Sequence, residues 1–215
     1  MVKLIEAVRF TTNWRKFAAE TEIRFEEPFT VIVGSQGSGK SSLLWSMGHL
    51  EQATPYLHVE RSGSPLEVTT RYFDGLYHNP QTWPQQLPIS RASRERSLGE
   101  SILELLSQAN FKRNLLLMDE PTMGLTLSNT LKVLHWCHYL TRGPWGNQVV
   151  VATNNVAFIE GLKTVYWLDK GKYCEPHEYL KEERNAGYSH PTHQSTVMDG
   201  VNSQPLQLQR EIQEN

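Results

Sequence analysis

Cysteine is scarce in this sequence of 215 residues, and long apolar runs are missing. The two cysteines, Cys137 and Cys174, favour buried or inert thiols in a reducing compartment over a disulfide framework. No apolar run approaches the roughly 20 residues that a membrane-spanning helix needs. The N-terminus also lacks a basic segment followed by an apolar core. We therefore predict no signal peptide, no direct membrane insertion and a cytoplasmic location, in the host cytoplasm if the chain is viral.

A strong charge of either sign is missing as well. Lysine and arginine total 21 against 23 acidic residues, which gives a formal net charge of -2. No global positive field therefore attracts nucleic acid or anionic lipid, although the numbers leave a local basic patch open. Hydrophobic residues make up 39% and charged residues 20%, the composition of an ordinary globular chain with one well-buried domain and room for a tail.

Short apolar and β-branched runs alternate along the chain with helical patterns. The runs predict strands at 2–10, 21–25, 29–33, 66–73, 115–118, 149–152 and 164–168. Helical spacing of apolar residues predicts helices over 40–50, 101–109 and 131–140. This alternation predicts an α/β fold with a mainly parallel central sheet. The polar composition after residue 183 predicts a folded domain over 1–183 and a flexible tail over 184–215.

A glycine-rich loop follows the strand predicted at 29–33. It consists of Gly34-Ser35-Gln36-Gly37-Ser38-Gly39-Lys40-Ser41 and fits the pattern G-x-x-x-x-G-K-[ST]. Glycines let successive backbone N–H groups converge on phosphate oxygens, and the following helix points its positive end at the same oxygens. We predict that these residues, with Ser42, bind ATP. Lys40 then stabilises the β- and γ-phosphates, and the Ser41 hydroxyl is a ligand of Mg²⁺.

Two acids end the apolar strand predicted at 115–118. Asp119 lies at the carboxyl end of this strand, where a carboxylate can reach Mg²⁺ or its waters. Glu120 follows it and is placed to activate the attacking water as a general base. Together with the glycine-rich loop Gly34 to Ser41, called the P-loop below, the pair predicts hydrolysis of the nucleotide.

These motifs resemble those of ABC-type ATPases. More narrowly, the stretch Asn13 to Thr21, followed by Ile23-Arg24-Phe25, is similar to the heads of the SMC and RecF branch. The resemblance covers roughly residues 1–178. It implies a P-loop NTPase fold in which helices flank the parallel sheet and an N-terminal antiparallel β element is added. It also implies that Arg15 or Lys16 helps to hold the nucleotide. Only about fifty residues separate Ser41 from Arg91, without heptads, so we expect a compact head without coiled-coil arms.

The same resemblance supplies two further sets of site residues. A short insertion, placed at about 51–112, contains a sequence similar to the signature motif that one ABC subunit presents to the γ-phosphate of another. The residues that match it are Ser97, Gly99 and Glu100. This implies a head-to-tail ATP-dependent dimer, with a second copy or with a related ATPase subunit. Gln81, with Gln85 and Gln86 as alternatives, is the candidate for the glutamine that contacts Mg²⁺ in this family.

Two positions depart from the family pattern. Thr126 stands where the family commonly has an aspartate, and Asn154 stands where it has a histidine. An asparagine can hydrogen-bond the γ-phosphate but cannot become a cation, so we keep Asn154 as a catalytic candidate and expect slow or partner-stimulated hydrolysis.

The sequence leaves several functions open. The first is an ATP-driven dimerisation switch in DNA repair, replication or phage-defence DNA metabolism, with a protein partner and with DNA as a candidate ligand. The second is the nucleotide-binding subunit of an ABC transporter, where the pattern D-E-P-T-x-G-L is common. The short segment between P-loop and signature, and the absence of a clear aromatic platform for adenine, argue against it. The third is an ATP-dependent binding protein with little or no hydrolysis. A small-molecule kinase is disfavoured by the acidic pair Asp119 and Glu120.

Overall fold

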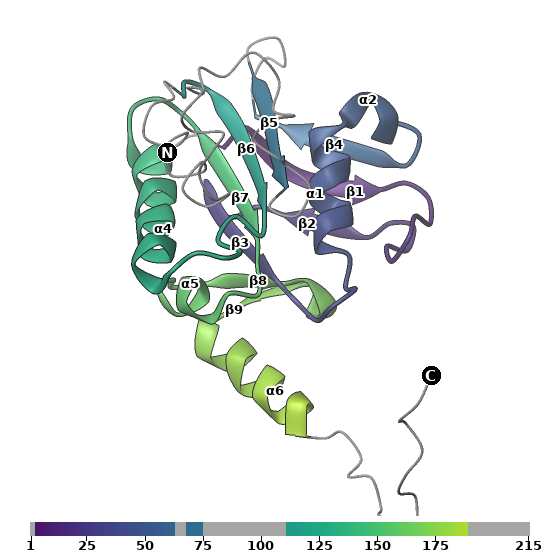
Figure 1. The fold of residues 1–215 in the computed structure, drawn as a ribbon. Helices are drawn as coiled ribbons and strands as arrows, with labels where there is room; N and C mark the ends of the chain where they lie inside the picture. Colours follow the sequence, from purple (N-terminus) through teal and green to yellow (C-terminus); the bar gives the residue numbers. More distant parts are fainter. Residues whose placement is uncertain (1–2, 63–67, 75–110, 189–215) are drawn as a thin grey trace, which may run out of the picture.

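Two β-sheets form the core of the fold (Figure 1). The structure is a computed structural model that describes residues 3–62, 68–74 and 111–188. The larger sheet has six strands in the order β5-β6-β7-β3-β8-β9. These strands are β5 (Thr69–Asp74), β6 (Asn114–Asp119), β7 (Gln148–Ala152), β3 (Phe29–Val33), β8 (Val165–Trp167) and β9 (Lys172–Cys174). All neighbours are parallel except β9, which runs antiparallel to β8. The predicted α/β fold with a mainly parallel sheet is therefore confirmed.

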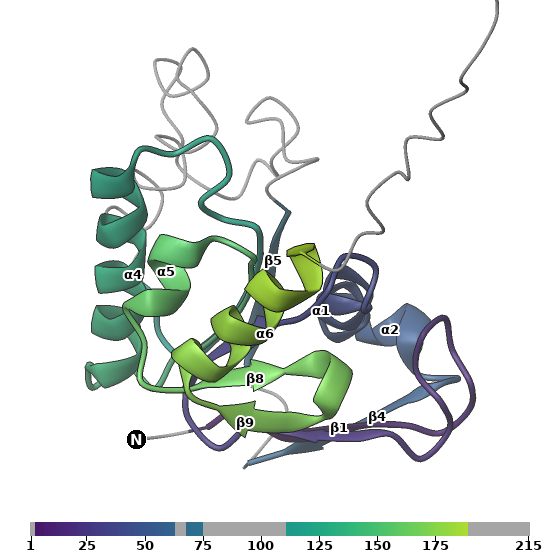
Figure 2. The ribbon, with the colours of Figure 1, turned by 90° about the horizontal axis from the view of Figure 1, so that it is seen from below.

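Helices cover both faces of this sheet. The helices α4 (Leu127–Arg142) and α5 (Val156–Glu160) lie on one face, and α1 (Lys40–Gly48) lies on the other (Figure 2). The short helix α2 (Leu50–Ala53) follows α1, and α6 (Pro176–Tyr188) ends the described part of the chain. Because parallel strands need crossover connections, helices on both faces are the expected consequence of this topology.

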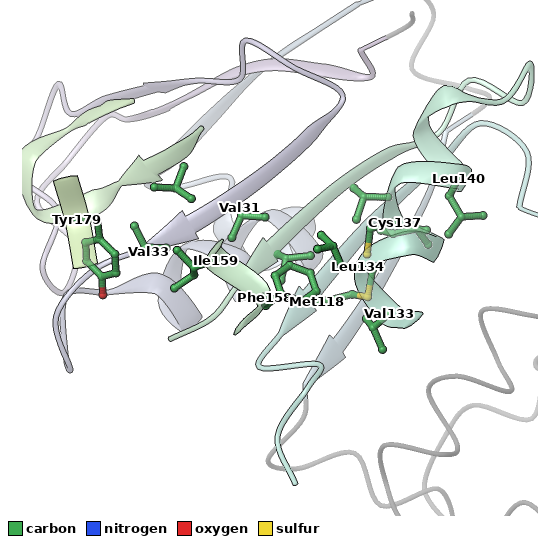
Figure 3. Close-up of a cluster of buried hydrophobic side chains, with 14 of the residues drawn as sticks. Val31, Val33, Met118, Val133, Leu134, Cys137, Leu140, Phe158, Ile159 and Tyr179 are labelled. Atoms are coloured by element: carbon green, nitrogen blue, oxygen red, sulfur yellow. The ribbon is translucent and has the colours of Figure 1, made fainter. Parts of the chain in front are cut away.

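Alternation along each central strand explains why both faces are apolar. Val31 and Val33 of β3 point toward α4, α5 and α6 and pack with residues such as Cys137 and Phe158 (Figure 3). Ile32, between them, belongs to the opposite cluster, where α1 contributes its apolar side chains. The same alternation holds in the other buried strands, so nearly every position in them is apolar.

The N-terminal residues form a separate antiparallel sheet. Its strands are ordered β2 (Glu22–Arg24), β1 (Ile5–Phe10) and β4 (Leu57–Arg61). The predicted N-terminal antiparallel element is thus confirmed, with β4 as an unpredicted third strand. A buried side chain is one of the links between the two sheets. Gln148, fully buried at the start of β7, accepts hydrogen bonds from the N–H groups of Leu4 and Ile5 at 2.8 and 2.7 Å.

Several predicted boundaries need correction. The strands β4 and β5 fall within the predicted insertion 51–112, and they belong to the two sheets. Helix α1 ends at Gly48 because a second short helix begins at Leu50. Helix α6 continues to Tyr188, past the predicted domain end at residue 183. The predicted helix at 101–109 and the remainder of the tail lie outside the described residues.

Candidate functional site

The glycine-rich loop connects the carboxyl end of β3 to the start of α1. Gly37 and Gly39 have φ values of +78° and +107°, which L-residues adopt only with strain. Gly39 is the N-cap of α1, and a Cβ at this position would lie 3.0 Å from the ring of Phe17. Glycine is therefore required here both by backbone conformation and by the close approach of an aromatic ring.

The loop retains unpaired hydrogen-bonding groups that suit a phosphate. No side chain among the described residues caps α1, and its first turn contains no acid, so its first N–H groups are available to an anion. The hydroxyl oxygen of Ser38 is buried without a hydrogen-bond partner within the described part of the chain. An unpartnered buried hydroxyl beside an uncapped helix start fits a loop that binds phosphate oxygens.

Lys40 lies folded over this loop. Its ammonium donates to the carbonyl oxygens of Gly34 and Ser35 at 2.7 and 3.1 Å, and only 8% of the residue is exposed. Burial lowers the pKa of Lys40 below its usual value, and the nearby carboxylates of Glu120, Asp169 and Asp119 oppose this shift. The ammonium is thus held beside the loop, with the two acids of the β6 end in its electrostatic surroundings.

Asp169, which the sequence reasoning missed, fixes the start of the loop. Its carboxylate accepts from the backbone N–H of Ser35 at 2.8 Å and from the Ser35 hydroxyl at 2.7 Å. Burial acts to raise the pKa of Asp169, but these hydrogen bonds outweigh it and keep the pKa below its usual value. A Cβ on Gly34 would lie 2.7 Å from the same carboxylate, so glycine is needed there. The only sequence signal was an acid just after the strand predicted at 164–168.

The acidic pair lies at the carboxyl edge of the parallel sheet. Asp119 ends β6, stands in register with Ala152 of β7, and is only 3% exposed. Ser41 lies in the first turn of α1, which packs against β6. A hydroxyl and a carboxylate at this edge match the oxygen ligands that Mg²⁺ accepts alongside nucleotide phosphates. The described residues contain no group of three or more His, Cys, Asp or Glu side chains able to hold a metal without a nucleotide.

Glu120 is held by contacts on both carboxylate oxygens. Thr153 donates its hydroxyl hydrogen to Oε2 at 2.9 Å, and the backbone N–H of Asn154 donates to Oε1 at 3.1 Å. The backbone of Glu120 has φ of +47°, in the left-handed region that non-glycine residues rarely adopt. Asn154, predicted through its side chain, thus contacts Glu120 through its main chain. Its side chain remains a candidate for the γ-phosphate.

The two basic candidates before the loop lie differently. The guanidinium of Arg15 donates to the Ser42 hydroxyl at 2.8 Å and lies over the rings of Trp14 and Trp45, at 4.5 and 5.8 Å from their centroids. Lys16 instead lines a cavity of about 390 Å³ beside the P-loop. Other residues that line it are Phe17, Ile23, Gln36, Gly37, Ser38, Tyr166 and Asp169. Of the two, Lys16 has the geometry to meet a ligand that extends from the loop.

Thr126 has a structural role that an aspartate at this position can also perform. Its side chain accepts a hydrogen bond from the N–H of Asn129 and caps the N-terminus of α4. Threonine and aspartate are both good N-caps, so threonine in place of the aspartate of the ABC-type pattern preserves the helix start. The remaining predicted residues lie outside the described residues: Gln81, Gln85, Gln86, Ser97, Gly99 and Glu100.

Comparison with known proteins supports the fold assignment. A family model described as an AAA domain matches residues 12–48. None of the curated proteins matches the sequence. Among solved structures, the ADP conformation of MJ1267, an ATP-binding cassette of an ABC transporter, matches at a TM-score of 0.51 and 13% identity, over 87% of this chain and 98% of that one. CbiO1 of Clostridium perfringens, part of the transporter complex cbiONQ, matches at 0.50 and 14%, over 88% and 97%.

These similarities establish the architecture. At such low identities they show that the chain has the fold of ABC-type ATPase heads, a P-loop NTPase fold, and they leave its activity and partners to be argued from the site. No helix within the described ranges is both long and apolar enough to cross a membrane.

Proposed function

We propose that this chain binds ATP with Mg²⁺ in the P-loop, hydrolyses it slowly, and acts as a nucleotide-dependent dimerisation switch. The observation that supports this most strongly is the convergence around Lys40. The lysine lies over the P-loop, within the electrostatic reach of Asp119 and Glu120, at the carboxyl edge of one parallel sheet. In open α/β sheets this edge is where ligands bind.

Each group then has a defined task. The N–H groups of the loop and of the α1 start bind the phosphates, and Lys40 neutralises charge on the β- and γ-phosphates. Ser41 and Asp119 would hold Mg²⁺, which supplies charge neutralisation to the phosphates when bound. Glu120 accepts a proton from the attacking water, whose oxygen forms the new bond to the γ-phosphorus as the bond to the ADP oxygen breaks. The cavity beside Lys16 offers space for the nucleoside.

A dimer is supported by apolar surface near the acidic pair. Met123, Leu127 and Val156 are 43%, 62% and 47% exposed, and they follow the carboxyl ends of β6 and β7. Large apolar side chains gathered beside a polar site suit burial by a partner. In the proposed dimer, Ser97, Gly99 and Glu100 of one copy complete the nucleotide site of the other.

The proposed cellular role is in DNA repair, replication or phage-defence DNA metabolism, following the resemblance of the N-terminal element to SMC and RecF heads. A transporter subunit is the second candidate. It is favoured by the segment Asp119 to Leu125, whose pattern is common in transporter ATPases, and by the transporter subunits among the structures that share this fold. A binding protein without hydrolysis is the third.

The test measures ATP binding, ATP turnover and oligomeric mass together, with and without double-stranded DNA. We expect wild type to hydrolyse ATP and Glu120→Gln to accumulate as an ATP-bound dimer. Glu51→Gln, an exposed acid on α2, is the matched control and should behave as wild type. Stimulation by DNA would favour the DNA role. Turnover without any DNA effect would favour the transporter role, and ATP binding without turnover the binding role. Failure of wild type to bind ATP would refute the proposal.

A further inference from the structure

The Glu120 carboxylate is restrained more tightly than a solvated acid at a strand end. The Thr153 hydroxyl and the Asn154 N–H each donate a hydrogen bond to one of its oxygens. The Glu120 N–H donates to the carbonyl of Ala152 at 2.8 Å. All three contacts come from the last residue of β7, Ala152, and from the segment that follows it. The side chain of a proposed general base is therefore positioned by a neighbouring strand rather than by its own.

Thr153 is itself held so that its hydroxyl hydrogen points at Glu120. The residue is fully buried, and its oxygen accepts the backbone N–H of Asn155 at 3.1 Å. Because the N–H of Asn155 already donates to this oxygen, the single hydroxyl hydrogen of Thr153 points toward the Glu120 carboxylate, at an oxygen–oxygen distance of 2.9 Å. These two hydrogen bonds fix the orientation of the Thr153 hydroxyl, and the hydroxyl in turn orients the Glu120 carboxylate.

The contacts leave the carboxylate able to accept a proton. An ionised carboxylate offers about four lone-pair sites, and Thr153 and Asn154 use two of them. No other contact of this carboxylate is present within the described residues, which leaves the other sites for water. We propose that Thr153 is a positioning residue for Glu120 in ATP hydrolysis, a role that rests on the proposed function. Of the two restraining donors, only the Thr153 hydroxyl can be removed by a side-chain substitution, because the other is the main chain of Asn154.

The experiment compares Thr153→Val with Thr153→Ser in the full chain. Valine keeps the shape and removes the hydroxyl, whereas serine keeps the hydroxyl and removes a methyl group. We expect Thr153→Val to lower kcat about 10- to 100-fold while the Kd for ATP stays within about twofold, because misplacing a general base affects the transition state and not ground-state binding. Thr153→Ser should recover most of the lost kcat.

A matched control is available on α4. Thr141 is also buried, and its hydroxyl donates to the carbonyl of Cys137 at 3.0 Å, in the last turn of the helix. Thr141→Val should alter melting temperature in the same manner as Thr153→Val but leave kcat unchanged. This comparison separates loss of a buried hydrogen bond from loss of positioning.

Three results would overturn the role of Thr153 and leave ATP hydrolysis intact: an unchanged kcat in Thr153→Val, a Thr153→Ser variant as slow as Thr153→Val, or a loss confined to ATP affinity. If wild type binds ATP but shows no turnover, the proposed hydrolysis and this role fall together.

Discussion

Replacing Gln148 by leucine tests how the N-terminal sheet is attached to the parallel sheet. The amide oxygen of Gln148 accepts from the N–H groups of Leu4 and Ile5 at 2.8 and 2.7 Å, and the amide nitrogen donates to the Ile5 carbonyl at 3.0 Å. All three residues are at most 2% exposed. Leucine is similar in volume and apolar, so it fills the space but accepts no hydrogen bond.

The expected loss of folding stability comes from the N–H groups of Leu4 and Ile5, which lose their hydrogen-bond acceptor. An unsatisfied buried donor costs about 1–3 kcal/mol, so the pair amounts to about 2–6 kcal/mol. For a domain of this size each kcal/mol lowers the melting temperature by about 2–4 °C, and we expect a fall of about 5–20 °C. Calorimetry measures the fall, and hydrogen exchange should show faster exchange at the Leu4 and Ile5 amides than in β6.

A control variant separates the loss of the Gln148 hydrogen bonds from the general effect of replacing a glutamine by leucine. Gln52 is an exposed glutamine on α2, and Gln52→Leu should change stability by no more than about 0.5 kcal/mol. A Gln148→Leu protein that melts within 2 °C of wild type, with unchanged exchange at β1, would show that these hydrogen bonds do not join the sheets.

Three further predictions concern the P-loop. Gly39→Ala should cost about 1–3 kcal/mol in backbone strain and should also weaken ATP binding, because the new Cβ would lie 3.0 Å from the Phe17 ring. A Cβ at Gly37 meets no atom within 4 Å, so Gly37→Ala should weaken ATP binding less. Equal losses of ATP affinity for the two variants in calorimetric titrations would contradict this prediction. ATP affinity should be constant near neutral pH, and it should fall as the pH rises through the pKa of Lys40, because only the ammonium form pairs with phosphate. Since the pKa of Lys40 is lowered, this fall should begin below the ordinary value of 10.5. A Kd for ATP that stays flat from neutral pH to 10.5 would contradict the prediction. Asp169→Ala frees the P-loop start and should reduce ATP affinity about tenfold, or about 1.4 kcal/mol, whereas tighter binding would mean that the carboxylate mainly repels phosphate.

The sequence alone determined the central strands, the P-loop and the acidic pair. Phe29–Val33 and residues 149–152 are short runs rich in β-branched residues, and such runs suit strands buried on both faces. Gly34 to Ser41 is a local motif whose conformation depends on its own glycines, so its place between β3 and α1 could be predicted without knowledge of distant residues. Apolar spacing, another local signal, predicted a helix at 131–140, which the structure extends to Leu127–Arg142.

The tertiary structure decided the contacts between segments that lie far apart in the chain. Asp169 meets Ser35 across 134 residues, and Thr153 meets Glu120 across 33, and neither pairing leaves a periodic signal in the sequence. The strand β4 was missed because Leu57–Arg61 is largely polar, with a burial pattern set by β1 beside it. A hydrogen bond needs only one suitable atom at the right place, and that place exists only once the sheet has brought the strand ends together. The P-loop could therefore be predicted from the sequence, whereas the side chains that hold it and Glu120 in position could not.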